Sequence, residues 1–188
     1  MGQLKKDFKF KIIKNFLDDN ERRLIKNYCT SYHINNQNNF DVLQNNNGDT
    51  SKYSDPLMES LLLCKLSKIQ EESGLKLLPT YSFWRMYTKF ADLKPHKDRP
   101  SCECSVTVQI ASDGTKWPIK IDGEEIILED GDAALYWGTE VEHSREEFLG
   151  DYQSQVFLHY VDANGPFKEY IYDKRVFAGI DLEKNINF

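Results

Sequence analysis

The stretch LKPHKDRPSCE, residues 93–103, places His96 and Asp98 two residues apart. Pro95 disfavours helical backbone at the residue before it, and apolar residues recur at every second position from residue 106 to residue 110. Extended backbone is therefore expected near His96. In a strand, side chains two residues apart point to the same side, so the imidazole and the carboxylate share one face.

A second histidine, His143, lies in YWGTEVEHSR, residues 136–145, far enough along the chain for several strands to intervene. Two histidines and one carboxylate can cover one triangular face of an octahedral ion. The opposite positions stay open for a bidentate co-substrate and dioxygen, which is how non-haem Fe(II) oxygenases use this set. We therefore predict that His96, Asp98 and His143 are metal ligands and catalytic residues. The alternative for an isolated His-x-Asp pair is an ordinary surface strand without a metal.

From about Tyr81 to Pro166 the chain resembles the small 2-oxoglutarate and Fe(II)-dependent oxygenases of the prolyl-4-hydroxylase type. The resemblance covers nearly half of the chain and is specific only as an ordered set of motifs. These are Arg85-Met86-Tyr87, His96-x-Asp98, the strand at residues 105–110, the strand at residues 131–136, His143, and the closing strand at residues 155–161.

The resemblance implies an enzyme that uses Fe(II) and 2-oxoglutarate, with dioxygen as a further substrate and ascorbate as a candidate reductant. Decarboxylation of 2-oxoglutarate to succinate would accompany hydroxylation of a peptidyl prolyl or other amino-acid side chain. A free amino acid or another small metabolite is the second choice of substrate.

The far carboxylate of 2-oxoglutarate needs a cationic partner, for which arginine is well suited. The family usually supplies an arginine or lysine about ten residues after the distal histidine, but residues 151–155 contain neither. Our first replacement is Arg145, which shares a strand face with His143, and our second is Lys120. An ion pair of Arg145 with a neighbouring glutamate at the surface is the alternative. By resemblance, Tyr87 and Thr107 also contact the co-substrate.

The fold class predicted is mainly β with N-terminal helices. Short β segments are expected at residues 105–111, 117–121, 124–128, 133–136, 141–148 and 153–161, with turn signals between them. Many short strands with turns indicate a jelly roll. The resemblance implies a double-stranded β-helix, the cupin-like form of that core. We expect a single oxygenase domain over residues 1–188, with strand and helical support at 1–75, the β-helix core at 76–165 and a C-terminal extension at 166–188.

The N-terminal support is predicted from local signals. An edge strand is expected in the first half of residues 8–17, followed by a helix whose apolar stripe contains Leu24, Ile25 and Tyr28. A second helix is expected from Asp55 to Gly74. Between them, the Asn-rich residues 33–50 favour a connecting loop over a lid, and His33 is expected to be solvated.

Composition excludes some functions and leaves others open. With 40% hydrophobic residues the 188-residue chain can bury a core, and its net charge of −6 makes nucleic acid an improbable partner. The absence of a long apolar run predicts no membrane segment, and the N-terminus lacks the features of a secretory signal, so we expect a cytoplasmic protein. The four cysteines are expected to be reduced thiols, with a soft-metal clip at Cys102-x-Cys104 as the alternative.

Two other functions fit the same pattern. One is a cupin-like jelly roll that binds a sugar or a divalent ion without redox chemistry. The other is an inactive oxygenase fold used for binding, which the missing late arginine or lysine keeps open. Trp84 and Trp137 are candidate walls of the site in the oxygenase interpretation, although core packing would bury them equally well.

Overall fold

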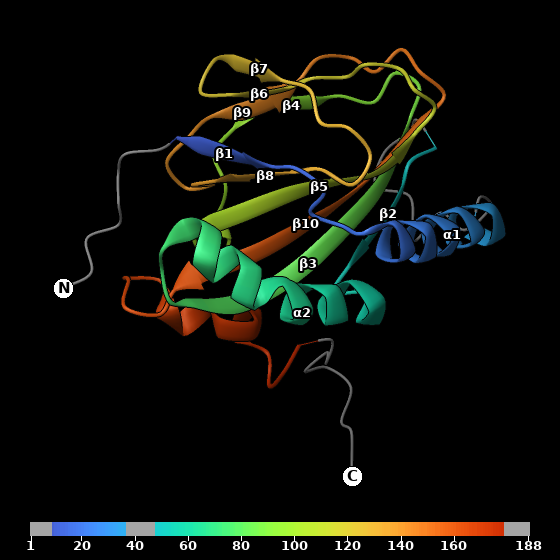
Figure 1. Ribbon diagram of the computed structural model, residues 1–188. Helices are drawn as coiled ribbons and strands as arrows, with labels where there is room; N and C mark the ends of the chain where they lie inside the picture. Colours follow the sequence, from blue (N-terminus) through green and yellow to red (C-terminus); the bar gives the residue numbers. More distant parts are fainter. Residues whose placement is uncertain (1–8, 37–47, 179–188) are drawn as a thin grey trace, which may run out of the picture.

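A computed structural model describes residues 9–36 and 48–178 of the chain (Figure 1). Its elements, in chain order, are β1 (Phe10–Ile13), α1 (Asp19–Asn36), β2 (Thr50–Tyr53), α2 (Pro56–Ser73), β3 (Leu77–Thr88), β4 (Leu93–His96), the 3-10 turn η2 (Pro100–Cys102), β5 (Cys104–Ser112), β6 (Ile119–Ile121), β7 (Glu124–Ile126), β8 (Ala133–Tyr136), β9 (His143–Arg145), β10 (Tyr152–Asp162) and the 3-10 segment η3 (Lys168–Lys174). The predicted Asn-rich connector lies partly outside the described residues, so its lid interpretation is not addressed.

Two antiparallel sheets face each other and form the predicted jelly roll. The larger has the strand order β1-β8-β5-β10-β3-β2, and the smaller has the order β4-β9-β6-β7. Figure 1 shows both helices on one side of the larger sheet and the smaller sheet on its other side. We call the helix-covered side the outer face and the side toward the smaller sheet the inner face. The prediction of a mainly β fold with N-terminal helices is confirmed.

Alternation along the central strands assigns their side chains to the two faces. On β5 and β10, the apolar residues Val106, Val108, Val156 and Leu158 are completely buried in the core cluster under the helices. The residues between them, including Thr107 and Gln155, point to the inner face. The larger sheet therefore has an apolar outer face and a polar inner face, both enclosed by protein.

Helix α1 begins with a reciprocal cap. The carboxylate of Asp18 accepts hydrogen bonds from the backbone N–H groups of Asn20 and Glu21, and the Glu21 carboxylate accepts one from the Asp18 N–H. The predicted stripe is wrong at Leu24, which is 59% exposed, because Ile25 and Cys29 take the buried positions one turn apart. His33 is not simply solvated either, since its Nδ1 lies 2.7 Å from the Thr50 hydroxyl.

Helix α2 has the predicted ends. The Asp55 carboxylate accepts from the Leu57 N–H, Pro56 occupies the first turn, and Gly74 closes the helix with φ of 70°. The buried Glu59 was not anticipated. Its carboxylate accepts hydrogen bonds from the backbone N–H and the hydroxyl of Ser82 on β3. It also pairs with Arg175, so Glu59 links the C-terminal segment to β3.

Several strands are shorter than predicted. Residues 117 and 118 precede β6 because Pro118 has no N–H for a ladder, and β9 ends at Arg145. Phe148 instead exchanges backbone hydrogen bonds with Phe90 and Ala91 in the loop after β3. Among the residues that the structure describes, no helix combines the length and apolar character needed to cross a bilayer.

Candidate active site

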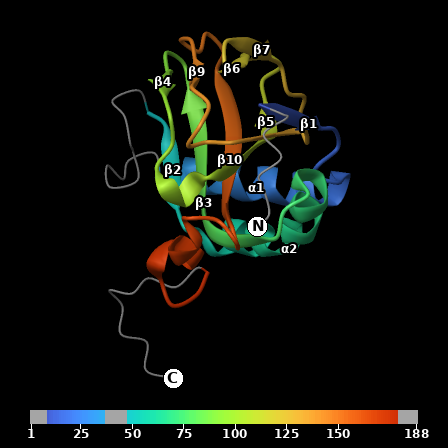
Figure 2. The same ribbon diagram turned by 90° about the vertical axis from the view of Figure 1, so that its left-hand side faces the viewer.

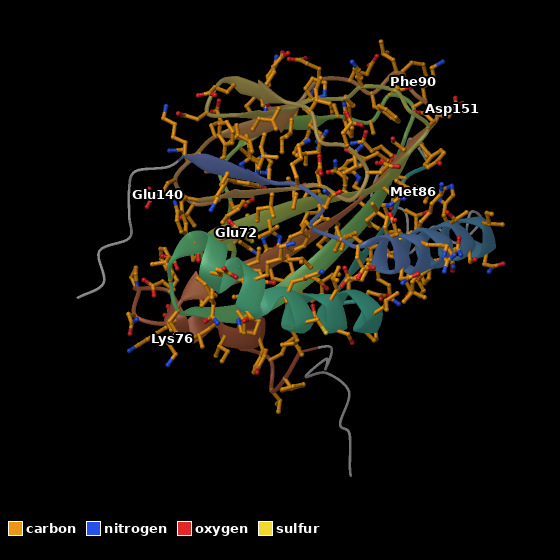
Figure 3. All side chains as sticks on the ribbon, in the orientation of Figure 1. Glu72, Lys76, Met86, Phe90, Glu140 and Asp151 are labelled. Atoms are coloured by element: carbon orange, nitrogen blue, oxygen red, sulfur yellow. The ribbon has the colours of Figure 1, made fainter. Side chains whose placement is uncertain are left out.

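A cavity of about 240 Å³ lies between the sheets on the inner face of β3 and β10. Figure 2 shows the two sheets after a 90° turn, and Figure 3 shows their side chains filling the space between them. The lining residues are Tyr81, Phe83, Arg85, Tyr87, Leu93, His96, Asp98, Tyr136, His143, Phe157 and His159. Four of the predicted site residues, His96, Asp98, His143 and Tyr87, are among them, whereas Thr107, Lys120 and Arg145 are not.

The three predicted metal ligands meet at one edge of the smaller sheet. His96 ends β4 and is the direct partner of His143 at the start of β9, and their ring centres are 4.3 Å apart. Asp98 Oδ1 lies 3.7 Å from His96 Nε2 and 3.5 Å from His143 Nε2. These atoms form a triangle of two nitrogens and one oxygen whose size suits a single bound ion.

Both histidines present Nε2 to that triangle. His96 Nδ1 lies 2.7 Å from the carbonyl oxygen of Lys94, and His143 Nδ1 lies 3.2 Å from that of Val141. A carbonyl oxygen can only accept a hydrogen bond, so each Nδ1 carries a proton and Nε2 is the nitrogen available to a metal. Backbone carbonyls therefore fix the ring orientation and the tautomer that a metal requires.

Asp98 is ready to act as an anionic ligand. Burial alone would raise the pKa of Asp98, but hydrogen bonds to His143 and Ser105 outweigh it, and the pKa lies below its ordinary value. The carboxylate is therefore ionised at neutral pH. A triangle of two imidazole nitrogens and one carboxylate suits Fe(II) and related divalent ions, with the opposite coordination positions left to exogenous ligands.

Arg145, two residues after His143, is buried inside the molecule and is 3% exposed. Its Nη1 donates to the Trp117 carbonyl oxygen at 2.5 Å, and its guanidinium stacks on the Trp117 ring. Within the described residues, Nε and Nη2 have no hydrogen-bond acceptor. Burial lowers the pKa of Arg145 to about 10, and the cavity-lining Tyr87 and Tyr136 are close enough to act on it. A buried cation without a carboxylate is costly, which indicates a site for an anionic ligand.

Further polar atoms without partners lie on the inner face of the larger sheet. In the described part of the chain, both amide atoms of Gln153 and the Nε2 of Gln155 are buried and unpaired, while the Thr107 hydroxyl donates to Gln155 Oε1 at 3.2 Å. Tyr87, opposite Gln153 in the sheet, lines the cavity. Each buried polar group without a hydrogen-bond partner costs about 1–3 kcal/mol. Such groups are expected where a bound ligand supplies the missing partners.

The structure does not bring Lys120 to this cavity. Ile119 and Ile121 are the inward residues of β6, so alternation turns Lys120 outward, where it pairs with Glu146 at 2.7 Å. Glu146, one of the glutamates next to Arg145, is thus paired with Lys120, and the burial of Arg145 excludes the surface ion pair considered for it.

The two predicted tryptophan walls also lie elsewhere. Trp84 and Trp137 belong to the core cluster that includes the outer face, and Trp117 packs against Tyr87 instead. Arg99, close to the ligand turn, pairs with Asp173 at 2.7 Å. The four cysteines are free thiols, and Cys104 packs in the outer-face core, so Cys102 and Cys104 do not form a clip.

Ser105 and His159 were not predicted as site residues. Ser105 Oγ lies 2.9 Å from Asp98 Oδ2 and 2.9 Å from His159 Nδ1. His159 is 5% exposed, and burial lowers its pKa to about 4, so its ring is neutral. The inward position of Ser105 in an alternating strand was the available signal, but its partner lies 54 residues away in the sequence.

The comparisons with known proteins place this geometry in context. No protein-family model matches the sequence, and no curated protein matches it. Among solved structures, a prolyl-4-hydroxylase of Pseudomonas putida is similar with 16% identity and a TM-score of 0.63, over 83% of this chain and 94% of that one.

Two further structures show the same likeness. A viral collagen prolyl hydroxylase of Paramecium Bursaria Chlorella virus-1, in its 2-oxoglutarate complex, has 9% identity and a TM-score of 0.62 over 82% of this chain and 96% of that one. EctD of S. alaskensis, with 2-oxoglutarate and 5-hydroxyectoine, has 10% identity and a TM-score of 0.66 over 89% of this chain and 80% of that one. The chain therefore has the jelly-roll fold of the 2-oxoglutarate and Fe(II)-dependent oxygenases, as its sequence motifs implied.

Proposed function

We propose that this protein is a non-haem Fe(II)- and 2-oxoglutarate-dependent dioxygenase that hydroxylates a peptidyl prolyl or other amino-acid side chain. The observation behind the proposal is an open triangle of His96, Asp98 and His143 together with the buried guanidinium of Arg145, which lies on the same strand as His143. His143 and Arg145 are two residues apart on β9, about 7 Å along a strand, which is comparable to the length of a five-carbon dicarboxylate.

His96, Asp98 and His143 would hold the iron through Nε2, a carboxylate oxygen and Nε2. The fit is supported by the two backbone carbonyls that fix the tautomers and by the lowered pKa of Asp98. When bound, iron and 2-oxoglutarate together supply the oxidising chemistry: dioxygen is consumed, 2-oxoglutarate is decarboxylated to succinate, and a C–H bond of the substrate is hydroxylated.

Arg145 would anchor the far carboxylate of 2-oxoglutarate through the N–H groups that lack a partner in the described structure. A charge-assisted pair with two N–H donors is both stronger and more directional than a neutral contact. Tyr87 and Thr107 would add contacts from the larger sheet, and the amides of Gln153 and Gln155 lie on the same inner face. Lys120 is left out of this binding site because it pairs with glutamates outside the cavity.

The remaining lining residues would shape the space for the substrate. Phe83, Phe157 and Leu93 give the cavity apolar surface, and the His96 side chain is 39% exposed, so the triangle is reachable from the His96 side. Apolar walls limit the access of water to the reacting centre. The likeness to two prolyl hydroxylases supports a peptidyl side chain as the first substrate class to test.

Succinate release from 2-oxoglutarate tests the proposal. Protein purified without oxygen and then supplied with Fe(II), 2-oxoglutarate and air should release succinate, and proline-containing peptides should stimulate the release. Replacing His96, Asp98 or His143 by alanine should abolish succinate formation while the domain stays folded, because open catalytic metal sites contribute less to folding than closed structural ones. Wild-type metal binding without succinate formation would favour the cupin-like interpretation, and normal turnover by any alanine variant would refute the triad.

A further inference from the structure

The two oxygens of Asp98 have different surroundings. Oδ1 faces the two histidine nitrogens at 3.7 and 3.5 Å, whereas Oδ2 accepts a hydrogen bond from the Ser105 hydroxyl at 2.9 Å. Carboxylates bind metals through either one or two oxygens. The hydrogen bond to Oδ2 therefore bears directly on which of the two modes Asp98 adopts.

His159 supports Ser105 from the neighbouring strand. Its Nδ1 lies 2.9 Å from Ser105 Oγ, and residues 105 and 159 are direct partners in the pairing of β5 with β10. Ser105 Oγ also lies 3.1 Å from the Cys102 carbonyl oxygen, but Asp98 Oδ2 is closer and charged and is the stronger acceptor for the single hydroxyl proton. When Ser105 donates to Asp98, the His159 Nδ1–H must donate to Ser105. The result is a one-directional chain of hydrogen bonds from His159 through Ser105 to Oδ2. Ser105 and His159 are at most 5% exposed, so water has little access to compete for these hydrogen bonds.

The backbone of Gly138 is hydrogen-bonded to the backbone of Asp98 and lies close to its carboxylate. The Asp98 N–H donates to the Gly138 carbonyl at 2.8 Å, and the Gly138 N–H donates to the Glu103 carbonyl at 3.1 Å. A Cβ on residue 138 would overlap Asp98 Oδ2 and the Cys102 carbonyl oxygen and would lie 2.7 Å from Ser105 Oγ. Glycine at this position is thus required by close packing around Oδ2, and the carboxylate has little room to rotate.

We propose that Ser105, supported by His159, is a positioning residue that holds Asp98 as a one-oxygen metal ligand. The inference rests on the proposed function. If Oδ2 also bound the metal, it would take one of the positions that a bidentate co-substrate and dioxygen need. By holding Oδ2 in a hydrogen bond, Ser105 keeps that position free, in the way that outer partners of metal ligands fix ligand orientation.

A competing use of the same residues is a second ion. Ligand atoms of Asp98, Cys102 and His159 all lie within 4.8 Å of one another, and sulfur and imidazole are donors that Zn²⁺ prefers. The observed contacts favour the hydrogen-bonded arrangement, because His159 Nδ1 and Asp98 Oδ2 face Ser105 and the Cys102 Sγ lies 3.0 Å from the Tyr81 hydroxyl.

Anaerobic titration of the metal-free full chain with Co(II) tests the positioning role by a readout that does not depend on turnover. Ser105→Ala should bind Co(II) about 10- to 100-fold more weakly than wild type. At saturating Co(II) it should also bind 2-oxoglutarate more weakly, because the released Oδ2 competes for the coordination position. The matched control is Ser154→Ala, a buried serine of β10 that is not among the cavity residues, which should change neither affinity.

A second pair of variants separates positioning from packing. His159→Phe removes the donor to Ser105 and should lower Co(II) affinity, whereas His159→Gln keeps a donor and should recover part of the loss. Wild-type affinities for both Co(II) and 2-oxoglutarate in Ser105→Ala would overturn the inference, as would two ions per chain with a cobalt–thiolate absorption band that disappears in Cys102→Ser. If His143→Ala binds Co(II) as wild type does, the metal triad and with it the proposed function fail first.

Discussion

Neighbouring residues of β10 are buried for different reasons. Val156 and Leu158 point to the outer face and are enclosed by apolar side chains of the helices and sheet. Gln155, Phe157 and His159 point to the inner face, where polar atoms outnumber the partners that the described chain offers them. Among the described residues, Trp84 Nε1 and Ser154 Oγ of the outer face lack a hydrogen-bond partner, but that face is otherwise filled by apolar side chains. The inner face leaves amide groups of Gln153 and Gln155 unpaired beside a cavity. One sheet can therefore stabilise the fold on one side and keep a binding site on the other, with a period of two residues separating the tasks.

The largest effect on ligand binding is expected at Arg145 on β9 of the smaller sheet. Arg145→Met should weaken 2-oxoglutarate binding by about 2–5 kcal/mol, or roughly 30- to several-thousand-fold, because the far carboxylate would be buried without a cation. Isothermal titration of the metal-loaded protein measures this, with Gln153→Ala expected to lose less. Lys120→Ala is the control for removal of a cation outside the cavity and should bind normally. If Lys120→Ala weakened 2-oxoglutarate binding and Arg145→Met did not, the anchor would be Lys120 on β6.

The same variant distinguishes binding from folding. Metal-free Arg145→Met should be at least as stable as wild type in urea, because the change removes a buried cation whose Nε and Nη2 find no acceptor among the described residues. A loss of several kcal/mol in the free energy of unfolding would show that Arg145 is a structural residue and not one kept for a ligand.

The opposite expectation holds for Leu158. Leu158→Ala should lower the free energy of unfolding by about 2–5 kcal/mol, because it empties a completely enclosed position in the outer-face core. Phe157→Ala, its neighbour on the same strand, borders the cavity and should lose less stability while changing the substrate requirement. Urea unfolding of the two variants compares them directly. Equal losses of stability would mean that the inner face is packed as tightly as the outer.

A smaller effect is expected from pH on the metal-free protein. The pKa of His159 is about 4 in the folded protein, against 6.5 for an unperturbed histidine, because burial disfavours the charged ring. Between these values the unfolded chain binds a proton that the folded chain does not, so stability falls as the pH drops from 6.5 to 4. The full contribution is about 3 kcal/mol at about 1.4 kcal/mol per pH unit. His159→Gln should flatten this part of the stability–pH curve, and parallel curves for the two proteins would contradict the buried neutral ring.

Local signals predicted the parts of the fold that local physics determines. The ends of α2 follow from Asp55, Pro56 and Gly74, each of which satisfies a helix terminus through its own backbone or side chain. The spacing of His96 and Asp98 placed both on one side of an extended segment. The inward position of Arg145 followed from the same two-residue period.

The misplaced residues depended on packing between distant segments. Leu24 and Ile25 are equally apolar, and only the position of the sheet decides which of them is buried. Lys120 required knowledge of which face β6 presents, and the roles of Ser105 and His159 required the register between β5 and β10. Sequence periodicity gives two faces for a strand but does not say which one meets the cavity.

The most direct test of the proposed site is the visible absorption of the protein mixed anaerobically with Fe(II) and 2-oxoglutarate. Bidentate binding of the 2-oxo acid to iron held by His96, Asp98 and His143 should produce a metal-to-ligand charge-transfer band that saturates at one equivalent of each. The band should be lost in His143→Ala and should need much more 2-oxoglutarate in Arg145→Met. Iron binding by wild type without any such band would contradict the assignment of the inner face as a 2-oxoglutarate site.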